Sequence, residues 1–225
     1  LGTVGQVVGG VVNTVGNLLG TVGTIVDPAT NTAGPAVSPR ILRETLGVGS
    51  TWSGRGVGVA VIDSGVEMSA DFQGRVTAFY DFTDGKSKAT SAFDDYGHGT
   101  HVAGIIGASG ALSYNRDYHG LAPQVKFLVL KVLDKDGAGY TSDVIRAVDF
   151  AVANRDRYGI DIINLSLGHP IYEPAGSDPL VAAVERASRA GIIVIAAAGN
   201  LGTNPETGLT GYAGITSPGN APSAI

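Results

Sequence analysis

Four short, almost continuously apolar runs constrain the fold of this chain more than any other feature. They are rich in Val, Ile and Leu and cover residues 57–62, 127–133, 160–167 and 192–198. Unbroken apolar runs of this length are typical of strands buried on both faces, which occur in parallel sheets. Stretches with helical periodicity separate the last three runs. This alternation predicts an α/β fold with a mainly parallel sheet covered on both faces.

The sequence also indicates where two of the intervening helices begin and end. Ser142 or Asp143 is expected to cap the first helix, and Gly159 is well placed to end it. Asp178 is expected to be the N-cap of the second helix, with Pro179 as its first residue. Both helices lie between apolar runs, so they are predicted to cover the sheet.

Two polar motifs lie at sites where such a fold places chemistry. The run at 57–62 is followed by D-S-G, whose acid is Asp63. This carboxylate is expected at the carboxyl end of a buried strand, the edge where open α/β sheets place their sites. Further along, His98 lies between two glycines in H-G-T-H-V-A-G, before a small-residue helix predicted at 102–107. Flanking glycines let a substrate backbone approach the imidazole closely.

Each motif also has a simpler interpretation. An Asp at a strand end often forms a turn or caps a helix. The two histidines three residues apart, His98 and His101, are also suitably spaced for a metal ion on a helix. However, neither H-E-x-x-H nor a neighbouring third ligand accompanies them, so the sequence favours a catalytic pair.

Together, D-S-G and H-G-T-H-V-A-G resemble the motifs of the subtilisin-like serine peptidases (subtilases), which also place the acid before the histidine. The resemblance covers roughly residue 40 to the end of the chain. It implies a three-layer fold and hydrolysis of peptide bonds by acyl transfer, in which Asp63 orients the imidazole and His98 is the general base. His101 would be structural. Asn200, which ends A-A-A-G-N, would donate to the oxyanion, although G-N after a strand is also a common turn.

The resemblance further implies how a substrate is held. Two segments would wall the primary specificity pocket, and the free edge of a third would pair with an extended peptide. In this sequence they are Ser166-Leu167-Gly168, Ala197-Ala198-Gly199 and Gly137-Ala138-Gly139. Asp71 lies where many family members have a calcium ligand, but the loop at 109–119 lacks the expected run of ligands. We therefore expect no cofactor, and Asp71 is equally well explained as a surface acid.

The serine motif of the family, G-T-S followed by Met or a small residue and then Ala, is absent, since no G-T in the chain precedes a serine. Residues 217–225 match the family segment that leads into the next strand. We therefore expect a subtilase body that is incomplete at the C-terminus and inactive by itself. The alternatives are a non-catalytic assembly fragment and a peptide-binding pseudoprotease that uses the edge at 137–139.

The first 39 residues contain a single charged residue, Asp27. Apolar residues follow a heptad spacing at Leu1, Val4, Val8, Val11, Val15, Leu18, Val22 and Ile25. Because each interior glycine opposes a lone helix by about 1 kcal/mol, segment 1–26 is interpreted as a flexible remnant or as a helix packed on another copy or on the domain. Membrane insertion is a third alternative. Residues 27–39 are expected to be a linker and residues 40–225 the peptidase domain.

Composition excludes several other functions. The chain has 225 residues, no cysteine and a formal net charge of −5. It therefore has no disulfide framework or thiol nucleophile, and no basic stripe indicates nucleic-acid binding. It starts without a methionine or a signal peptide, which suggests a processed product, and the resemblance implies secretion. Peptide or protein substrates are expected, and also a homo-oligomer formed through segment 1–26 and a bare sheet surface.

Overall fold

The computed structural model describes residues 51–116, 118–200 and 214–225, a few residues between 43 and 48, and the backbone of three strands near the N-terminus. These strands are β1 (Gln6–Val8), β2 (Ile25–Asp27) and β3 (Thr32–Gly34), and β2 pairs antiparallel with β3. Within segment 1–26, β1 and the start of β2 are therefore extended rather than helical. The rest of the predicted heptad segment and most of the linker lie outside the described residues, so the proposed domain boundaries stay predictions.

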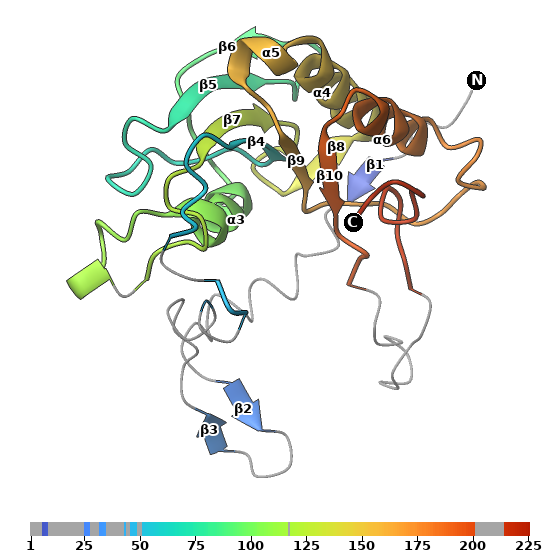
Figure 1. Cartoon of the computed structure of the whole chain (residues 1–225). Coiled ribbons are helices and arrows are strands. Elements are labelled where there is room, and N and C mark those ends of the chain that lie inside the picture. Colours follow the sequence, from blue (N-terminus) through green and yellow to red (C-terminus); the bar gives the residue numbers. More distant parts are fainter. Residues whose placement is uncertain are drawn as a thin grey trace.

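A six-stranded sheet forms the centre of the structure, in the order β10-β9-β4-β7-β5-β6 (Figure 1). Its strands are β4 (Gly58–Asp63), β5 (Val76–Asp81), β6 (Lys88–Ala89), β7 (Lys126–Lys131), β9 (Ile162–Leu165) and β10 (Ile193–Ala196). All neighbours are parallel except β5 and β6. Each predicted apolar run overlaps one strand, so the predicted α/β class with a mainly parallel sheet is confirmed.

Helices cover both faces of this sheet (Figure 1). One face carries α4 (Thr141–Ala153), α5 (Arg155–Tyr158) and α6 (Pro179–Arg189). The opposite face carries α3 (His98–Gly107), which is followed by a short 3-10 helix at Tyr114–Arg116. None of the helices in the described parts of the chain is long and apolar enough to cross a membrane.

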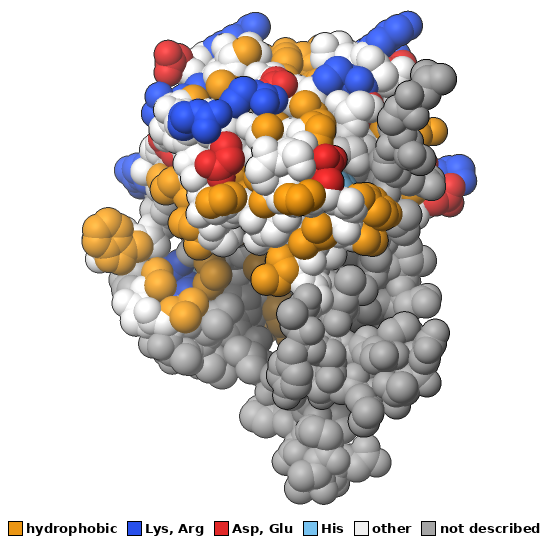
Figure 2. Space-filling model, turned by 90° about the vertical axis from the view of Figure 1, so that its right-hand side faces the viewer, with side chains coloured by type: hydrophobic (Ala, Val, Ile, Leu, Met, Phe, Trp, Pro, Cys, Tyr) orange, Lys and Arg blue, Asp and Glu red, His pale blue; other side chains and the backbone are white. Residues whose placement is uncertain are grey.

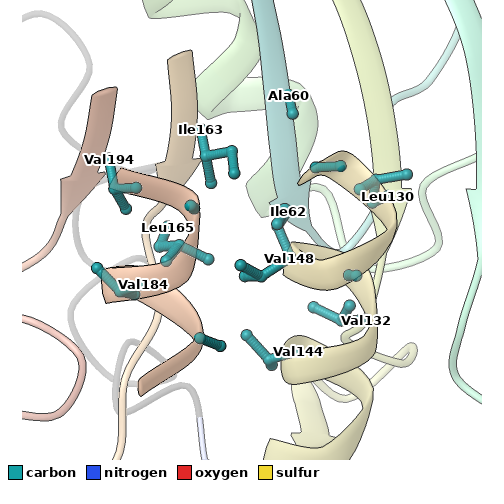
Figure 3. Packing of buried hydrophobic residues seen from close by; sticks show 14 of the residues in the cluster. Ala60, Ile62, Leu130, Val132, Val144, Val148, Ile163, Leu165, Val184 and Val194 are labelled. Carbon is teal, nitrogen blue, oxygen red and sulfur yellow. The ribbon is translucent and has the colours of Figure 1, made fainter. Parts of the chain in front are cut away.

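The alternation of side chains along β4 divides the core into two clusters. Ala60 and Ile62 pack with residues of α4 and α6, including Val148 (Figure 3). Val59 and Val61 belong to the second cluster, on the side of α3. Because successive side chains of a strand point to opposite faces, the next residue in the series of Val59 and Val61 is Asp63. Its carboxylate is therefore presented to the face that carries α3.

One helix cap was predicted correctly and another was not. Asp178 Oδ1 accepts hydrogen bonds from the first turn of α6, including 2.8 Å from Leu180 N. By contrast, the N-cap of α4 is Tyr140, without a side-chain capping bond, and neither Ser142 nor Asp143 caps it. The reason is that β8 (Ala138–Tyr140) runs directly into α4, so the two predicted caps already lie in the first helical turn.

Candidate active site

The two polar motifs meet at the carboxyl edge of the sheet. Asp63 is the last residue of β4 and is fully buried, while His98 is the first residue of α3. The distance between His98 Nδ1 and Asp63 Oδ1 is 2.7 Å. Because Nδ1 is held by the carboxylate, Nε2 is the ring atom left to accept a proton. An acid and an imidazole in this relation can activate a nucleophile.

Asp63 also raises the pKa of His98. Burial lowers the pKa of His98, but the hydrogen bond and the negative charge of Asp63, with a contribution from Asp94, raise it above its ordinary value overall. Burial and the neighbouring His98 instead lower the pKa of His101. The buried carboxylate thus favours the imidazolium that forms when His98 takes up a proton.

A metal ion at this pair would need further side-chain ligands. In the described parts of the chain, no group of three His, Cys, Asp or Glu side chains is placed to hold a metal ion. Asp71, the candidate calcium ligand, accepts hydrogen bonds from Ala111 N at 2.6 Å and from Ser109 Oγ at 3.2 Å. Its carboxylate therefore holds the loop that follows α3.

Asp94 is a residue of this site for which the sequence analysis assigned no role. Oδ1 accepts from Gly97 N at 2.8 Å, and Oδ2 accepts from Thr100 N at 2.9 Å and from Thr100 Oγ1 at 2.5 Å. Burial raises the pKa of Asp94, but hydrogen bonds from Thr100, Gly97 and Ser64 outweigh it, so the pKa is lowered overall. The N-cap of α3 is Gly97, which has no side chain, and the ionised carboxylate of Asp94 takes over the capping role by accepting from Gly97 N and Thr100 N. An acid just before a helix start was the available signal.

The serine of D-S-G joins the strand end to the helix. Ser64 is fully buried, its hydroxyl donates to Asp94 Oδ1 at 2.9 Å, and it accepts from Gly99 N at 2.9 Å. A Cβ atom on Gly99 would lie 2.1 Å from Gly65 O. Gly99 is therefore required because the helix packs on the protein's own backbone, rather than for the predicted approach of a substrate. Around Gly97, whose φ is +96°, the space is open.

The two predicted pocket walls follow neighbouring strands and converge on Thr216, which the sequence analysis missed. A Cβ atom on Gly168 would lie 2.6 Å from Thr216 Oγ1, and one on Gly199 would lie 2.8 Å from Thr216 Cγ2. Thr216 N also donates to Ala198 O at 2.9 Å. The segments 166–168 and 197–199 are thus brought together around one side chain.

The other two predicted site elements are placed as follows. Asn200 is exposed and directly follows Gly199, whose φ is +105°. The next residues, 201–213, lie outside the described residues, so the oxyanion role of Asn200 stays a prediction. The predicted substrate edge forms β8, which pairs antiparallel with β1: Val8 is opposite Ala138, and Val7 is opposite Gly139.

The fold and the site define a class: an α/β protein whose buried strand-end acid orients a histidine at the start of the following helix. The sequence model described as the Subtilase family matches residues 54–225, and the chain therefore belongs to the subtilase family. The chain is 41% identical over 182 residues to serine protease AprX of Bacillus subtilis (strain 168), which covers 79% of this chain and 39% of AprX.

Two further relatives agree with this assignment. Subtilisin DY of Bacillus licheniformis is 38% identical over 162 residues, covering 72% of this chain and 53% of that protein. The solved structure of sphericase is similar at 35% identity with a TM-score of 0.66, covering 79% of this chain and 55% of that chain. The chain thus spans about half the length of these two relatives, and less of AprX.

Proposed function

We propose that this chain contributes the acid, the base and the oxyanion donor of a subtilisin-like serine endopeptidase. Asp63 holds the imidazole, His98 takes the proton of a serine hydroxyl and returns it to the leaving amine, and Asn200 donates to the oxyanion. The observation that carries this proposal is the 2.7 Å hydrogen bond between Asp63 and His98. Membership of a serine peptidase family supports the same reaction.

In this proposal the nucleophile comes from a segment outside these 225 residues. No G-T-S motif occurs in the sequence, and the chain spans only part of its relatives. In subtilisin, loss of the nucleophile lowers turnover by about 2 × 10⁶-fold. We therefore expect the chain alone to be inactive. We further propose that an extended peptide pairs with β8 and places a side chain beside segments 166–168 and 197–199, next to Thr216.

A chimera tests the catalytic proposal. The chain alone and the chain fused to the C-terminal part of AprX are treated with a fluorophosphonate probe and, separately, with a chromogenic peptide. We expect labelling and turnover only in the chimera, and we expect both to disappear in the His98→Ala chimera. Labelling that survives His98→Ala would overturn the assignment of His98 as the base.

Peptide binding without cleavage is the second candidate function, and the pairing of β8 with an extended strand favours it. Fluorescence anisotropy of a labelled extended peptide measures it directly. Saturable binding by a chimera that shows neither labelling nor turnover would favour the binding module over the peptidase.

We also propose that the chain self-associates through the exposed apolar face of strand β10 when nothing covers that face. Val194 is buried under α6, but Ile193 and Ile195, on the other face of edge strand β10, are 49% and 36% exposed. Hydrophobic side chains also gather below Lys and Arg side chains on the side that carries α6 (Figure 2). Exposed apolar surfaces of this kind drive association. A monodisperse monomer by light scattering at tens of micromolar would contradict self-association.

Family membership does not by itself assign a compartment. One relative, 38% identical over 164 residues, is named an intracellular serine protease of Paenibacillus polymyxa. Secretion of this protein therefore stays a proposal, and detection of the protein in the culture medium by antibody would support it.

A further inference from the structure

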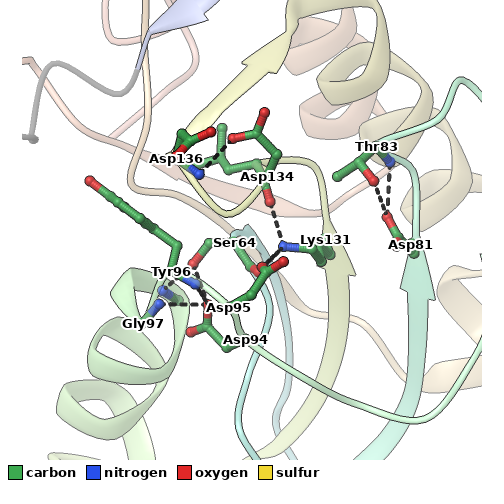
Figure 4. Close-up of polar contacts among 12 residues, drawn as sticks. Ser64, Asp81, Thr83, Asp94, Asp95, Tyr96, Gly97, Lys131, Asp134 and Asp136 are labelled. Carbon is green, nitrogen blue, oxygen red and sulfur yellow. Dashed lines mark hydrogen bonds and ion pairs between the residues drawn. The ribbon is translucent and has the colours of Figure 1, made fainter.

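The buried lysine at the end of β7 takes no part in the chemistry proposed above. Lys131 is 2% exposed, and its Nζ donates to Ser64 O at 2.7 Å, to Asp95 Oδ1 at 2.6 Å and to Leu133 O at 2.7 Å (Figure 4). An ammonium group has three N–H donors, and all three are used here. Nζ also lies 5.1 Å from the ring centroid of Phe93.

Stability alone does not explain this arrangement. Taking a charge out of water is costly, and a buried ion pair is often no more stabilising than apolar side chains of the same volume. Lys131, the last residue of β7, also interrupts the otherwise apolar run F-L-V-L-K-V-L of residues 127–133. The identity of its three partners therefore matters more than their number.

The three partners come from the three segments that build the proposed site. Ser64 directly follows the acid Asp63, Asp95 lies in the loop that leads into His98, and Leu133 precedes the turn into β8. Asp63 is also the direct neighbour of Lys131 across the parallel pair of β4 and β7. Side chains at neighbouring positions of two strands lie on the same face. The ammonium group thus lies where acid, base and substrate edge adjoin.

A second contact joins the same loop to the substrate edge. A Cβ atom on Gly137 would lie 2.4 Å from Cζ of Tyr96, so the Tyr96 ring occupies the space that a side chain there would need. Tyr96 directly follows Asp95, the acid bound by Lys131. The loop before His98 is therefore held both to the strand ends and to the turn that opens β8.

We propose that Lys131 is a positioning residue that locks the loop of His98 onto the strand end of Asp63 and ties both to the start of the substrate edge. This role of Lys131 in positioning His98 for catalysis rests on the proposed peptidase function. Its effect on His98 does not require turnover, however, so it is measurable in the chain alone.

The test is an NMR titration of His98 in the intact chain, comparing the wild type with Lys131→Met. Asp63 and Asp94 raise the pKa of His98. The other titratable groups beside it are His101, whose own pKa His98 lowers, and Tyr96, whose ring centroid lies 6.5 Å away. If Lys131 positions the loop, the substitution loosens the Asp63–His98 hydrogen bond and the pKa of His98 falls toward its ordinary value. If Lys131 acts only through its positive charge, its removal makes the pKa rise. A rise or an unchanged pKa of His98, whatever the stability of the variant, would overturn the proposal.

Two further variants keep the test decisive. Lys131→Arg retains the charge but not the three-point geometry, so positioning predicts that the pKa of His98 still falls, and this variant replaces Lys131→Met if that protein does not fold. Because the chain has no cysteine, Lys131→Cys can be alkylated at a single thiol with 2-bromoethylamine in urea and refolded. This restores an ammonium group of nearly the original length, and with it the His98 pKa.

The matched control is Lys135→Met. Lys135 lies close by in the sequence, is 71% exposed and pairs only with the exposed Asp136 in the described ion pairs. The Lys135→Met substitution is expected to leave the pKa of His98 unchanged. Failure of the peptidase proposal would appear separately, as an unlabelled chimera, even where the Lys131 variants move the pKa of His98.

Discussion

Replacing Asp94 with alanine removes the carboxylate that caps the helix of His98. Asp94 accepts five hydrogen bonds, from Ser64 Oγ, Tyr96 N, Gly97 N, Thr100 N and Thr100 Oγ1. Hydrogen bonds to a charged group contribute about 1.5–3 kcal/mol each, but Asp94 is partly exposed, so water replaces some of them. Loss of an N-cap typically costs about 0.5–2 kcal/mol. We therefore expect Asp94→Ala to lower the free energy of unfolding by about 2–4 kcal/mol.

The effect should depend on pH in a defined direction. The pKa of Asp94 is lowered in the folded protein, and an unfolded Asp has a pKa of about 3.9. The ionised carboxylate therefore stabilises the fold fully above pH about 3.9, and this contribution is lost as the pH falls through the folded value. The difference between wild type and Asp94→Ala should accordingly be large at pH 7 and shrink below about pH 4.

Urea unfolding followed by far-UV circular dichroism measures the difference in the free energy of unfolding at pH 7 and at pH 3. Asp84→Ala is the matched control, because Asp84 is exposed and the hydrogen bond described for it is a local one, accepted from Lys86 N at 3.1 Å. Its effect should stay within about 0.5 kcal/mol. A loss for Asp94→Ala below about 0.5 kcal/mol, or a loss equally large at pH 3, would refute the assignment of Asp94 as an ionised cap.

Three further predictions concern the same elements. Asp63→Asn should lower the pKa of His98, which NMR titration measures. The pKa of His98 is raised in the folded protein, so protonated His98 stabilises the fold fully below the unfolded pKa of about 6.5, and this stabilisation is lost as the pH rises through the folded pKa. Asp63→Asn should therefore lose stability mainly at mildly acidic pH. An unchanged pKa of His98 would contradict this prediction. Gly99→Ala should cost about 1–3 kcal/mol in urea unfolding, since its Cβ would meet Gly65 O. Gly104→Ala in the same helix has free space and should be neutral or stabilising, so equal effects of the two substitutions would count against the steric argument. Asp178→Ala should cost about 0.5–2 kcal/mol through the lost cap of α6, whereas Asp178→Asn should retain most of it; equal losses in thermal unfolding would show that capping is not the cause.

Much of the fold was predictable because its signals are local. A buried parallel strand needs an apolar run, and each run in the sequence overlaps one strand. The cap at Asp178 followed by Pro179 is likewise a local pattern. The proximity of Asp63 and His98 was predictable for a different reason, since an acid at a strand end and a histidine before a helix are both delivered to the carboxyl edge of the sheet.

The supporting residues of the site were harder to predict, because their partners are distant in the chain. Lys131 and Ser64 are 67 residues apart, and no periodicity encodes a hydrogen bond over that separation. Thr216 acquires its place only when two neighbouring strands bring Gly168 and Gly199 to it. A single lysine inside an apolar run was nevertheless a usable signal, because a buried ammonium group requires partners.

If a peptide binds along β8 as proposed, the antiparallel pairing of β1 with β8 makes that binding a competition within one molecule. The backbone of Gln6–Val8 already uses the edge that an extended peptide would need. Because β1 and β8 belong to the same chain, β1 is present at β8 at an effective concentration on the order of millimolar. An incoming peptide would have to displace this internal strand, so its apparent affinity would depend on how tightly the first residues of the chain hold β8. Removal of those residues would then tighten peptide binding without any change in the site itself.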